Sequence, residues 1–317
     1  MNNEMFSLDK ERAEQVFKRL VKAYENKEKI FSWPDVFPEQ RFTRLYDPSS
    51  LEFRLILFFT VNFDRNQQSS PYYRKVAESI EKKKFRNPQE ILDYDIEKIK
   101  RLREIWGIPF KKTAPYVMHK NIQLLKEKYN GDPLNVIKDE QDVNKARKNL
   151  EVFKGYGPHL SALLMTFYLK YGVISFDNQK KLEVKIDTNK LRVMYDNSII
   201  NPGEEHRWGD IHKDKILPAA RKFLCDVCEE HDLDTNIVSE AMWPIGERIS
   251  RQYKHHLGKR KLNYIMNSPL LEFTDYTQYL DIPYGKNTVA KLKKRGFDVK
   301  GSYCYFQKLD SDQKLLI

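Results

Sequence analysis

Cysteine is scarce in this sequence, which has three cysteines in 317 residues. A small, odd number of cysteines excludes a disulfide framework and is typical of a protein in a reducing compartment. Long apolar runs are also missing, since none approaches the roughly 20 residues that a membrane-spanning helix needs. The polar start, MNNEMFSLDKERAEQ, lacks the apolar stretch of a secretory signal. We therefore expect an intracellular, cytoplasmic protein with no membrane partner.

Negative charge is in short supply as well. The chain has 45 Asp and Glu against 56 Lys and Arg, which gives a net charge of +11 and a pI of about 9.2. This surplus favours a polyanionic partner but identifies no chemistry. Hydrophobic residues make up 40% of the chain and aromatic residues 13%, so a folded core is expected despite a mean hydropathy of −0.70. The length predicts about two domains.

Nearly every periodic segment predicts a helix. Ser7 can cap a first helix that runs to Asn26 with an apolar stripe on one side. The most apolar stretch, Leu51 to Phe63, has few β-branched residues and predicts a buried helix, with a strand as the alternative. Further helices are expected over Tyr72–Lys84, a short segment from Pro88, Asp95–Trp106 and Ala114–Tyr129. Gly107 and the pair Asn130-Gly131 suit left-handed helix ends.

Two segments break this pattern. Val173 to Asp187 contains two short alternating runs around Asp177-Asn178-Gln179, which predict a small β-hairpin inserted between helices. After Ile265 the sequence becomes mixed, which suggests a small C-terminal extension. Short helices joined by short loops, with no fixed-period repeat, predict a compact all-α fold.

The most informative segment is a glycine-containing turn between two expected helices. A helix should end near Phe153, the turn Lys154-Gly155-Tyr156-Gly157 should reverse the chain, and Pro158 should lie in the first turn of the next helix. Gly155 and Gly157 can adopt positive φ and present backbone N–H groups with no Cβ in the way. Such N–H groups beside a helix N-terminus can bind a phosphate. An ordinary helix–helix turn is the alternative.

An isolated aspartate, Asp187, follows in VKIDTNKLRVMYD. Together, the turn and this segment resemble the helix-hairpin-helix (HhH-GPD) DNA glycosylases of the endonuclease III and adenine glycosylase type. The hairpin of that family is L-P-G-V-G-x-x-T-A, and its catalytic aspartate lies in I-L-D-G-N-V-K-R-V or V-D-T-H-x-x-R-V. The resemblance extends to FRLILFFTVNFDRNQQSS, to the run of short helices after it and to SEAMWPIGERISR, and it covers about Leu51 to Arg251.

The resemblance implies that Asp187 is the catalytic carboxylate. Cleavage of an N-glycosidic bond develops positive charge on the sugar, which a carboxylate beneath C1′ stabilises while it orients the attacking water. Asp187 could equally cap the helix TNKLRVMYD. The two roles are compatible, because a capping carboxylate is held rigidly and has its charge stabilised by the helix N-terminus.

The resemblance also implies a set of DNA contacts, since the target base must leave the duplex. The hairpin would bind phosphate through the N–H groups of Gly155, Gly157 and His159, with Tyr156 beside them and Lys154 facing a phosphate. Asn62 would act as the wedge that replaces the flipped base, with Gln67 and Gln68 as alternatives. Further residues expected on the DNA side are Asn189 and Arg192, and two basic runs, Lys254–Lys261 and Lys291–Gly296, would add phosphate attraction.

Two departures from the family narrow the expected chemistry. Bifunctional members have a lysine two residues after the second hairpin glycine, where this chain has His159, and imidazole forms no stable iminium with a sugar aldehyde. Many members also end in a four-cysteine iron–sulfur loop, whereas here Cys225 and Cys228 form a C-x-x-C with only Cys304 far downstream. Free cysteines are expected, and a zinc site with His231 is the alternative.

Together these features predict an all-α, two-domain helix-hairpin-helix glycosylase fold. Residues 51–161 would form a helical barrel that ends in the hairpin, residues 1–50 and 162–264 a second domain, and residues 265–317 an extension, with Asp187 in the cleft between the domains. The expected activity is hydrolytic removal of a modified or mispaired base from double-stranded DNA by a monomer, without metal, cofactor or efficient strand cleavage. A bifunctional glycosylase/lyase using Lys154 or Lys185, a non-catalytic DNA-binding protein and a protein-interaction scaffold are alternatives. The excised base, and the choice between repair and attack on modified foreign DNA, stay open.

Overall fold

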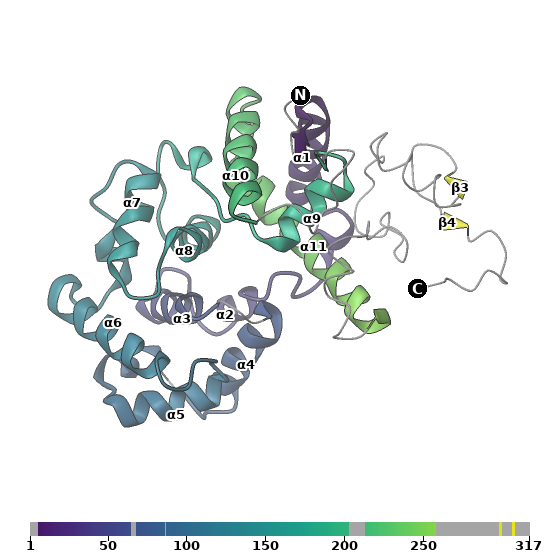
Figure 1. The fold of residues 1–317 in the computed structure, drawn as a ribbon. Coiled ribbons are helices and arrows are strands. Elements are labelled where there is room, and N and C mark those ends of the chain that lie inside the picture. The colour runs from purple at the N-terminus through teal and green to yellow at the C-terminus, as the bar shows by residue number, and fades with distance from the viewer. Residues whose placement is uncertain are drawn as a thin grey trace. The chain divides into compact units, whose positions relative to one another are not determined.

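A computed structural model describes residues 6–64, 68–85, 87–202 and 213–257, together with two short strands at 298–299 and 306–307. Within these residues helices predominate, and the sheets are limited to two antiparallel pairs of very short strands (Figure 1). The all-α class is therefore confirmed. Among the described helices, none is both long and apolar enough to cross a membrane.

The chain forms two compact units. Unit 1 joins residues 1–33 to residues 186–317, and unit 2 consists of residues 34–185. The expected boundaries were residues 50 and 161, so the observed unit 2 is longer at both ends. The reason on the C-terminal side is that α8 (Pro158–Lys170), the helix after the hairpin, packs against α3 (Leu51–Asn62) and so belongs to the middle of the chain.

Unit 2 is built around α3 and α8. Both helices are apolar on nearly every side and almost completely buried, as expected for helices at the centre of a core. The buried helix predicted for Leu51 to Phe63 is therefore confirmed, and the strand alternative is wrong. The elements around this pair are α2 (Gln40–Thr43), α4 (Ser69–Glu81), η2 (Pro88–Asp93), α5 (Ile96–Trp106), α6 (Ala114–Tyr129), η3 (Pro133–Val136), α7 (Val143–Asn149), η4 (Leu150–Val152) and η5 (Gln179–Lys181).

Local capping explains where several of these helices begin and end. Ser50 and Asp95 accept hydrogen bonds from the backbone N–H groups of Phe53 and Lys98, which start α3 and α5. Gly107 ends α5 with φ of 70° and Asn130 ends α6 with φ of 52°, which confirms both left-handed helix ends.

The β-hairpin predicted for residues 173–187 is wrong. This segment contains no strand, and its one regular element is the 3₁₀ turn η5. Leu182, Val184 and Ile186 do alternate inward as a strand would. The backbone nearby bonds instead to side chains at the start of α7, since Asn144 accepts from the Glu183 N–H (2.8 Å) and donates to the Lys181 carbonyl (2.8 Å).

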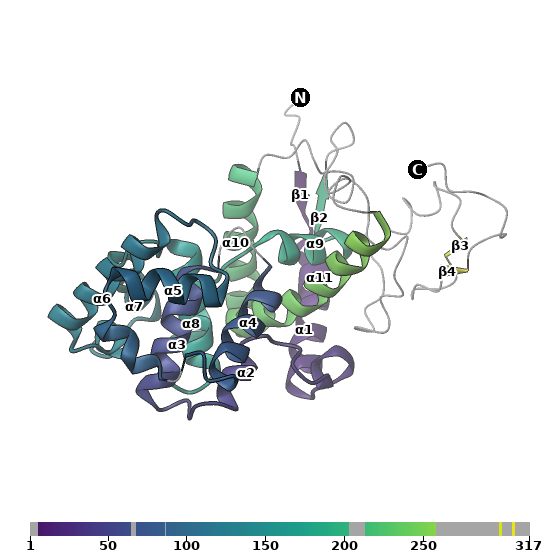
Figure 2. The same cartoon turned by 90° about the horizontal axis from the view of Figure 1, so that it is seen from below.

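Unit 1 combines both ends of the chain. Its described elements are β1 (Phe6–Leu8), α1 (Lys10–Glu25), η1 (Lys29–Ser32), α9 (Thr188–Asp196), β2 (Ile200–Pro202), α10 (Lys213–Glu230), α11 (Thr235–Leu257), β3 (Asp298–Val299) and β4 (Phe306–Gln307). The strands β1 and β2 pair antiparallel with Ser7 opposite Asn201 (Figure 2). Ser7 is thus a strand residue, and Asp9 caps α1 in its place by accepting from the Arg12 N–H.

The C-terminal extension is described only at its paired strands β3 and β4. The side chains of both basic runs, Lys254–Lys261 and Lys291–Gly296, lie outside the described residues, and so does Cys304.

Candidate nucleic-acid interface

The hairpin in unit 2 is a tight turn followed directly by a helix. Residues 153–156 form a four-residue turn that the Tyr156 N–H closes on the Phe153 carbonyl (3.1 Å). Gly155, third in the turn, has φ of 88°, a position where glycine is the usual residue. Gly157 has φ of −125° and is the N-cap of α8, and Pro158 follows in the first turn. Positive φ, expected at both glycines, is therefore found only at Gly155.

The outer side of the hairpin presents backbone donors. In the part of the chain that the structure describes, the N–H groups of Gly155 and Gly157 make no hydrogen bond. An added Cβ at Gly157 would meet no atom within 4 Å, so this backbone is open to close approach. Lys154 and His159 on either side are exposed. Free N–H groups at a helix N-terminus with a lysine beside them suit an anion.

Two buried asparagines hold the inner side of the hairpin. Asn121 of α6, only 1% exposed, accepts from the Lys154 N–H (2.8 Å) and donates to the Lys154 carbonyl (2.8 Å). Asn62 donates to the same carbonyl (3.0 Å) and accepts from Asn121 (3.2 Å). Because each polar group beneath the turn has a partner, the backbone of Lys154 is fixed against α3 and α6.

The structure places Asn62, the predicted wedge, beneath the hairpin and away from solvent. Its side chain is fully buried and bonded at both ends, so it cannot enter a duplex without breaking the support of the hairpin. Gln68, one of the alternatives, is exposed just before α4, and Gln67 lies outside the described residues.

Tyr156 also faces inward, contrary to its predicted place on the DNA side. Its hydroxyl donates to the Phe58 carbonyl (2.5 Å), and its ring stacks on the Phe58 ring with centroids 5.1 Å apart. Burial raises the pKa of Tyr156 well above its usual value. The side chain therefore anchors the hairpin to α3.

The two segments that form the hairpin and its support on α6 carry no acidic residue. The sequence has no Asp or Glu between Glu104 and Glu127, or between Glu151 and Asp177. The Asn121–Lys154 hydrogen bonds place these two acid-free segments side by side. The nearest carboxylate in the sequence, that of Glu151, is paired with Arg147 (2.5 Å). Lysines in the two acid-free segments therefore attract phosphates over distances of about 10 Å at moderate salt.

Asp187 in unit 1 caps α9. Its Oδ1 accepts from the N–H groups of Asn189 (3.0 Å) and Lys190 (3.1 Å), and the Leu191 N–H bonds to its carbonyl. The predicted capping role is therefore confirmed. Oδ2 accepts no hydrogen bond from any described residue, and the side chain is only partly buried. The carboxylate is thus held by one oxygen and leaves the other available.

A close approach of two helices positions this cap. An added Cβ on Gly246 of α11 would lie 2.3 Å from the Asn189 carbonyl oxygen and 2.7 Å from its carbon. Only glycine fits where α11 meets the first turn of α9. The buried Lys190 side chain adds a hydrogen bond to Ser239 of α11 (2.5 Å).

The two further residues predicted on the DNA side of this segment differ in exposure. Asn189 is partly exposed, whereas Arg192 is only 6% exposed. The guanidinium of Arg192 is therefore not on the open surface, and its predicted contact with DNA stays a prediction. The structure thus places Lys154, Gly155, Gly157 and His159 together in unit 2, and Asp187 and Asn189 together in unit 1.

The cysteine pair of α10 shows no metal-site arrangement in the described residues. Cys228 is buried, which raises the pKa of its thiol, and Cys225 is partly exposed. Both are free thiols, and the described residues contain no group of three or more His, Cys, Asp or Glu able to hold a metal ion.

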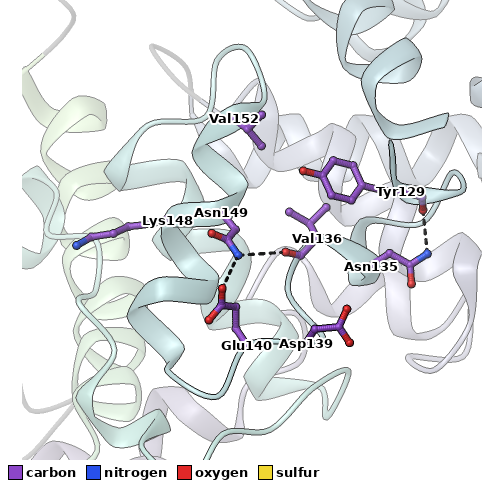
Figure 3. A pocket seen from close by; sticks show the side chains of 8 residues that line it. All are labelled: Tyr129, Asn135, Val136, Asp139, Glu140, Lys148, Asn149 and Val152. Carbon is purple, nitrogen blue, oxygen red and sulfur yellow. Dashed lines mark hydrogen bonds between the residues drawn. The ribbon is translucent and has the colours of Figure 1, made fainter. Parts of the chain in front are cut away.

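A hollow of about 530 Å³ opens elsewhere on unit 2, beside Tyr129 and Val152 (Figure 3). Several of its polar groups are paired, since Asn149 donates to Glu140 (3.1 Å) and Asn135 donates to the Tyr129 carbonyl (2.8 Å). With Asp139 and Glu140 in its lining, this hollow does not suit a polyanion and forms no part of the candidate interface.

Comparisons with known proteins add no assignment. No family model matches the chain, and searches of curated proteins and of solved structures gave no match. Sequence reasoning missed two residues that shape the site. Asn121 had a detectable signal, because it is an amide among apolar residues of a helix, whereas Gly246 resembles any helical glycine until its neighbour is known.

Proposed function

We propose that this protein is a monofunctional DNA glycosylase that hydrolyses the N-glycosidic bond of a modified or mispaired base flipped out of duplex DNA. Water adds at C1′, the bond from C1′ to the base nitrogen breaks, and the base leaves with a proton. The proposal combines the motif resemblance with the geometry of the hairpin and of Asp187.

The observation that carries the proposal is the state of the Asp187 carboxylate. One oxygen is fixed by two backbone N–H groups of α9 and the other is available. Fixed negative charge stabilises a developing oxocarbenium ion without reorganisation, and in many enzymes such stabilisation contributes more to the rate than any other effect. The available oxygen is also able to orient the attacking water.

The hairpin supports DNA as the partner. Its two open N–H groups, the exposed Lys154 and the absence of acidic residues from both adjoining segments favour binding of a phosphate. His159 at the position of the family's lysine favours hydrolysis over strand cleavage, because no amine follows the turn there.

The test is mass spectrometry of the bases released from a panel of duplexes with oxidised, alkylated, deaminated, mismatched and hypermodified bases. We expect release of at least one base class by the wild type. Asp187→Asn should lower its rate by at least about 100-fold, because the amide still caps α9 but carries no charge.

Asp234→Asn is the matched control. Asp234 caps α11 through the N–H groups of Asn236 (2.8 Å) and Ile237 (3.3 Å), in the same way that Asp187 caps α9. It should leave base release unchanged. A wild type that releases no base from any duplex, while it and Asp187→Asn bind DNA equally, would show a non-catalytic DNA-binding protein. Borohydride trapping of a covalent complex would show a lyase.

A further inference from the structure

The exposed side of α6 carries a basic and aromatic stripe next to the hairpin. Lys112, Tyr116 and Lys120 are spaced four residues apart, so they follow one line along the helix and the turn that leads into it. All three are exposed, and Tyr116 is 57% exposed. Among the described residues, the exposed large hydrophobic residues are Trp33, Tyr116 and Val152, and Tyr116 is the most exposed of the three.

The stripe adjoins the hairpin on one side. Its neighbours on α6 are Val117, which lies 3.6 Å from an added Cβ on Gly155, and Asn121, which holds the Lys154 backbone. The side chains that face solvent at Tyr116 and Lys120 therefore border the face of α6 on which the hairpin rests. The open N–H groups and the stripe therefore lie on two elements of unit 2 that contact each other.

Charge on the two sides of the stripe is different. Lys112 and Lys120 form no ion pair with any described carboxylate. Towards α5, Lys100 lies near Tyr116 but is paired with Glu97 (2.6 Å), so its charge is compensated. The uncompensated positive charge therefore extends from the stripe towards the hairpin.

We propose that this stripe is a second nucleic-acid contact, in which Lys112 and Lys120 bind the phosphates of one DNA strand and Tyr116 stacks on an unpaired base of that strand. Lysines that follow a backbone, with an aromatic ring exposed between them, are the combination that binds unpaired nucleotides without sequence preference. The inference rests on the proposed function in one respect only, the assumption that DNA is the partner. It adds a preference for DNA with an unpaired base beside the hairpin site.

The test measures binding to a fully paired 20-base-pair duplex and to the same duplex with a one-base bulge, by fluorescence anisotropy over a range of salt concentrations. The double variant Lys112→Ala/Lys120→Ala should reduce the slope of log K against log salt by about 1.8 for both duplexes, because each phosphate contact contributes about 0.9. At about 0.1 M salt this corresponds to a roughly 60-fold weaker affinity.

The matched control is Lys138→Ala/Lys148→Ala, which removes two other exposed lysines, one next to Asp139 in the sequence and one that lines the hollow with Asp139 and Glu140. It should leave the slope unchanged. Tyr116→Ala should weaken binding of the bulged duplex at least about fivefold and leave the paired duplex unaffected, and Tyr116→Phe should retain stacking. Unaltered melting temperatures would exclude a folding effect for these exposed positions.

The proposal would be overturned if the wild type and the Lys112→Ala/Lys120→Ala variant had equal salt slopes. It would also be overturned if the control variant Lys138→Ala/Lys148→Ala lost as much DNA affinity as the Lys112→Ala/Lys120→Ala variant. If Tyr116→Ala bound the bulged duplex as tightly as the wild type does, the stacking role of Tyr116 would be overturned. These results are independent of base release, so failure of the stripe is distinguishable from failure of the glycosylase activity.

Discussion

The substitution Gly246→Ala tests whether the close contact between α11 and α9 positions Asp187. The added methyl group would lie 2.3 Å from the Asn189 carbonyl oxygen, and an ordinary carbon–oxygen contact is about 3.3 Å. The first turn of α9 and α11 must therefore separate by about 1 Å. The atoms involved are backbone, so no side-chain rotation relieves the contact.

Two consequences of different kinds are expected. Overpacking against backbone should cost about 3 kcal/mol, which the better helix propensity of alanine offsets by about 1 kcal/mol, so the free energy of unfolding should fall by about 2 kcal/mol. A displacement of about 1 Å at Asp187 should lower the rate of base release by about 100-fold. Binding of undamaged DNA should change little, because the hairpin lies in the other unit.

Single-turnover base release and urea unfolding measure these two effects separately. Gly157→Ala is the control for stability, because its added methyl group meets no atom within 4 Å and its φ of −125° suits any residue. If Gly246→Ala releases base within twofold of the wild-type rate and unfolds at the same urea concentration, the close contact is absent and the positioning argument fails.

Three further substitutions each remove one interaction that stabilises unit 2. Asn121→Ala leaves the Lys154 N–H unpaired, so the free energy of unfolding measured in urea should fall by about 2 kcal/mol. DNA should also bind more weakly. Lys170→Ala removes the buried partner of Glu39 (2.7 Å) and should lower the free energy of unfolding by about 3–5 kcal/mol in the same assay. The hydrogen bond from the Lys145 N–H lowers the pKa of Asp142, because it stabilises the ionised carboxylate in the folded protein. The stability that Asp142 contributes is therefore complete above about pH 5 and is lost as the pH falls further. Asp142→Asn should flatten that acid dependence in unfolding curves measured from pH 6 to about pH 3.

Each of these predictions has a result that would contradict it. Asn121→Ala with unchanged stability would show that the amide does not hold the hairpin. Lys170→Met, which keeps the apolar stem but not the charge, should be nearly as destabilising as Lys170→Ala, and a wild-type stability would mean that Glu39 is not left uncompensated. An Asp142→Asn profile as steep as that of the wild type would place the acid sensitivity elsewhere.

Much of unit 2 could be predicted because its signals are local. The apolar content of α3 and the glycine after Trp106 specify a buried helix and a helix end from a few neighbouring residues. The turn at Gly155 is equally local, because a left-handed residue between two helices favours glycine.

The structure differs from the predictions where distant partners decide the outcome. Leu182, Val184 and Ile186 have the alternation of a strand, but the side chains of α7 take the hydrogen bonds that a second strand would supply. Asn62 and Arg192 have residue types common on DNA-binding surfaces, and both are buried. Motif spacing gives the position of such residues in the chain but not the side on which neighbouring helices cover them.

The most direct test of the central claim compares base release by the wild type, Asp187→Asn and Asp234→Asn under single-turnover conditions on the duplex that the wild type processes best. We predict that Asp187→Asn is at least about 100-fold slower, while Asp234→Asn, which loses an equivalent capping charge in the same unit, retains the wild-type rate. Equal rates for the two variants, or wild-type activity in Asp187→Asn, would contradict the account.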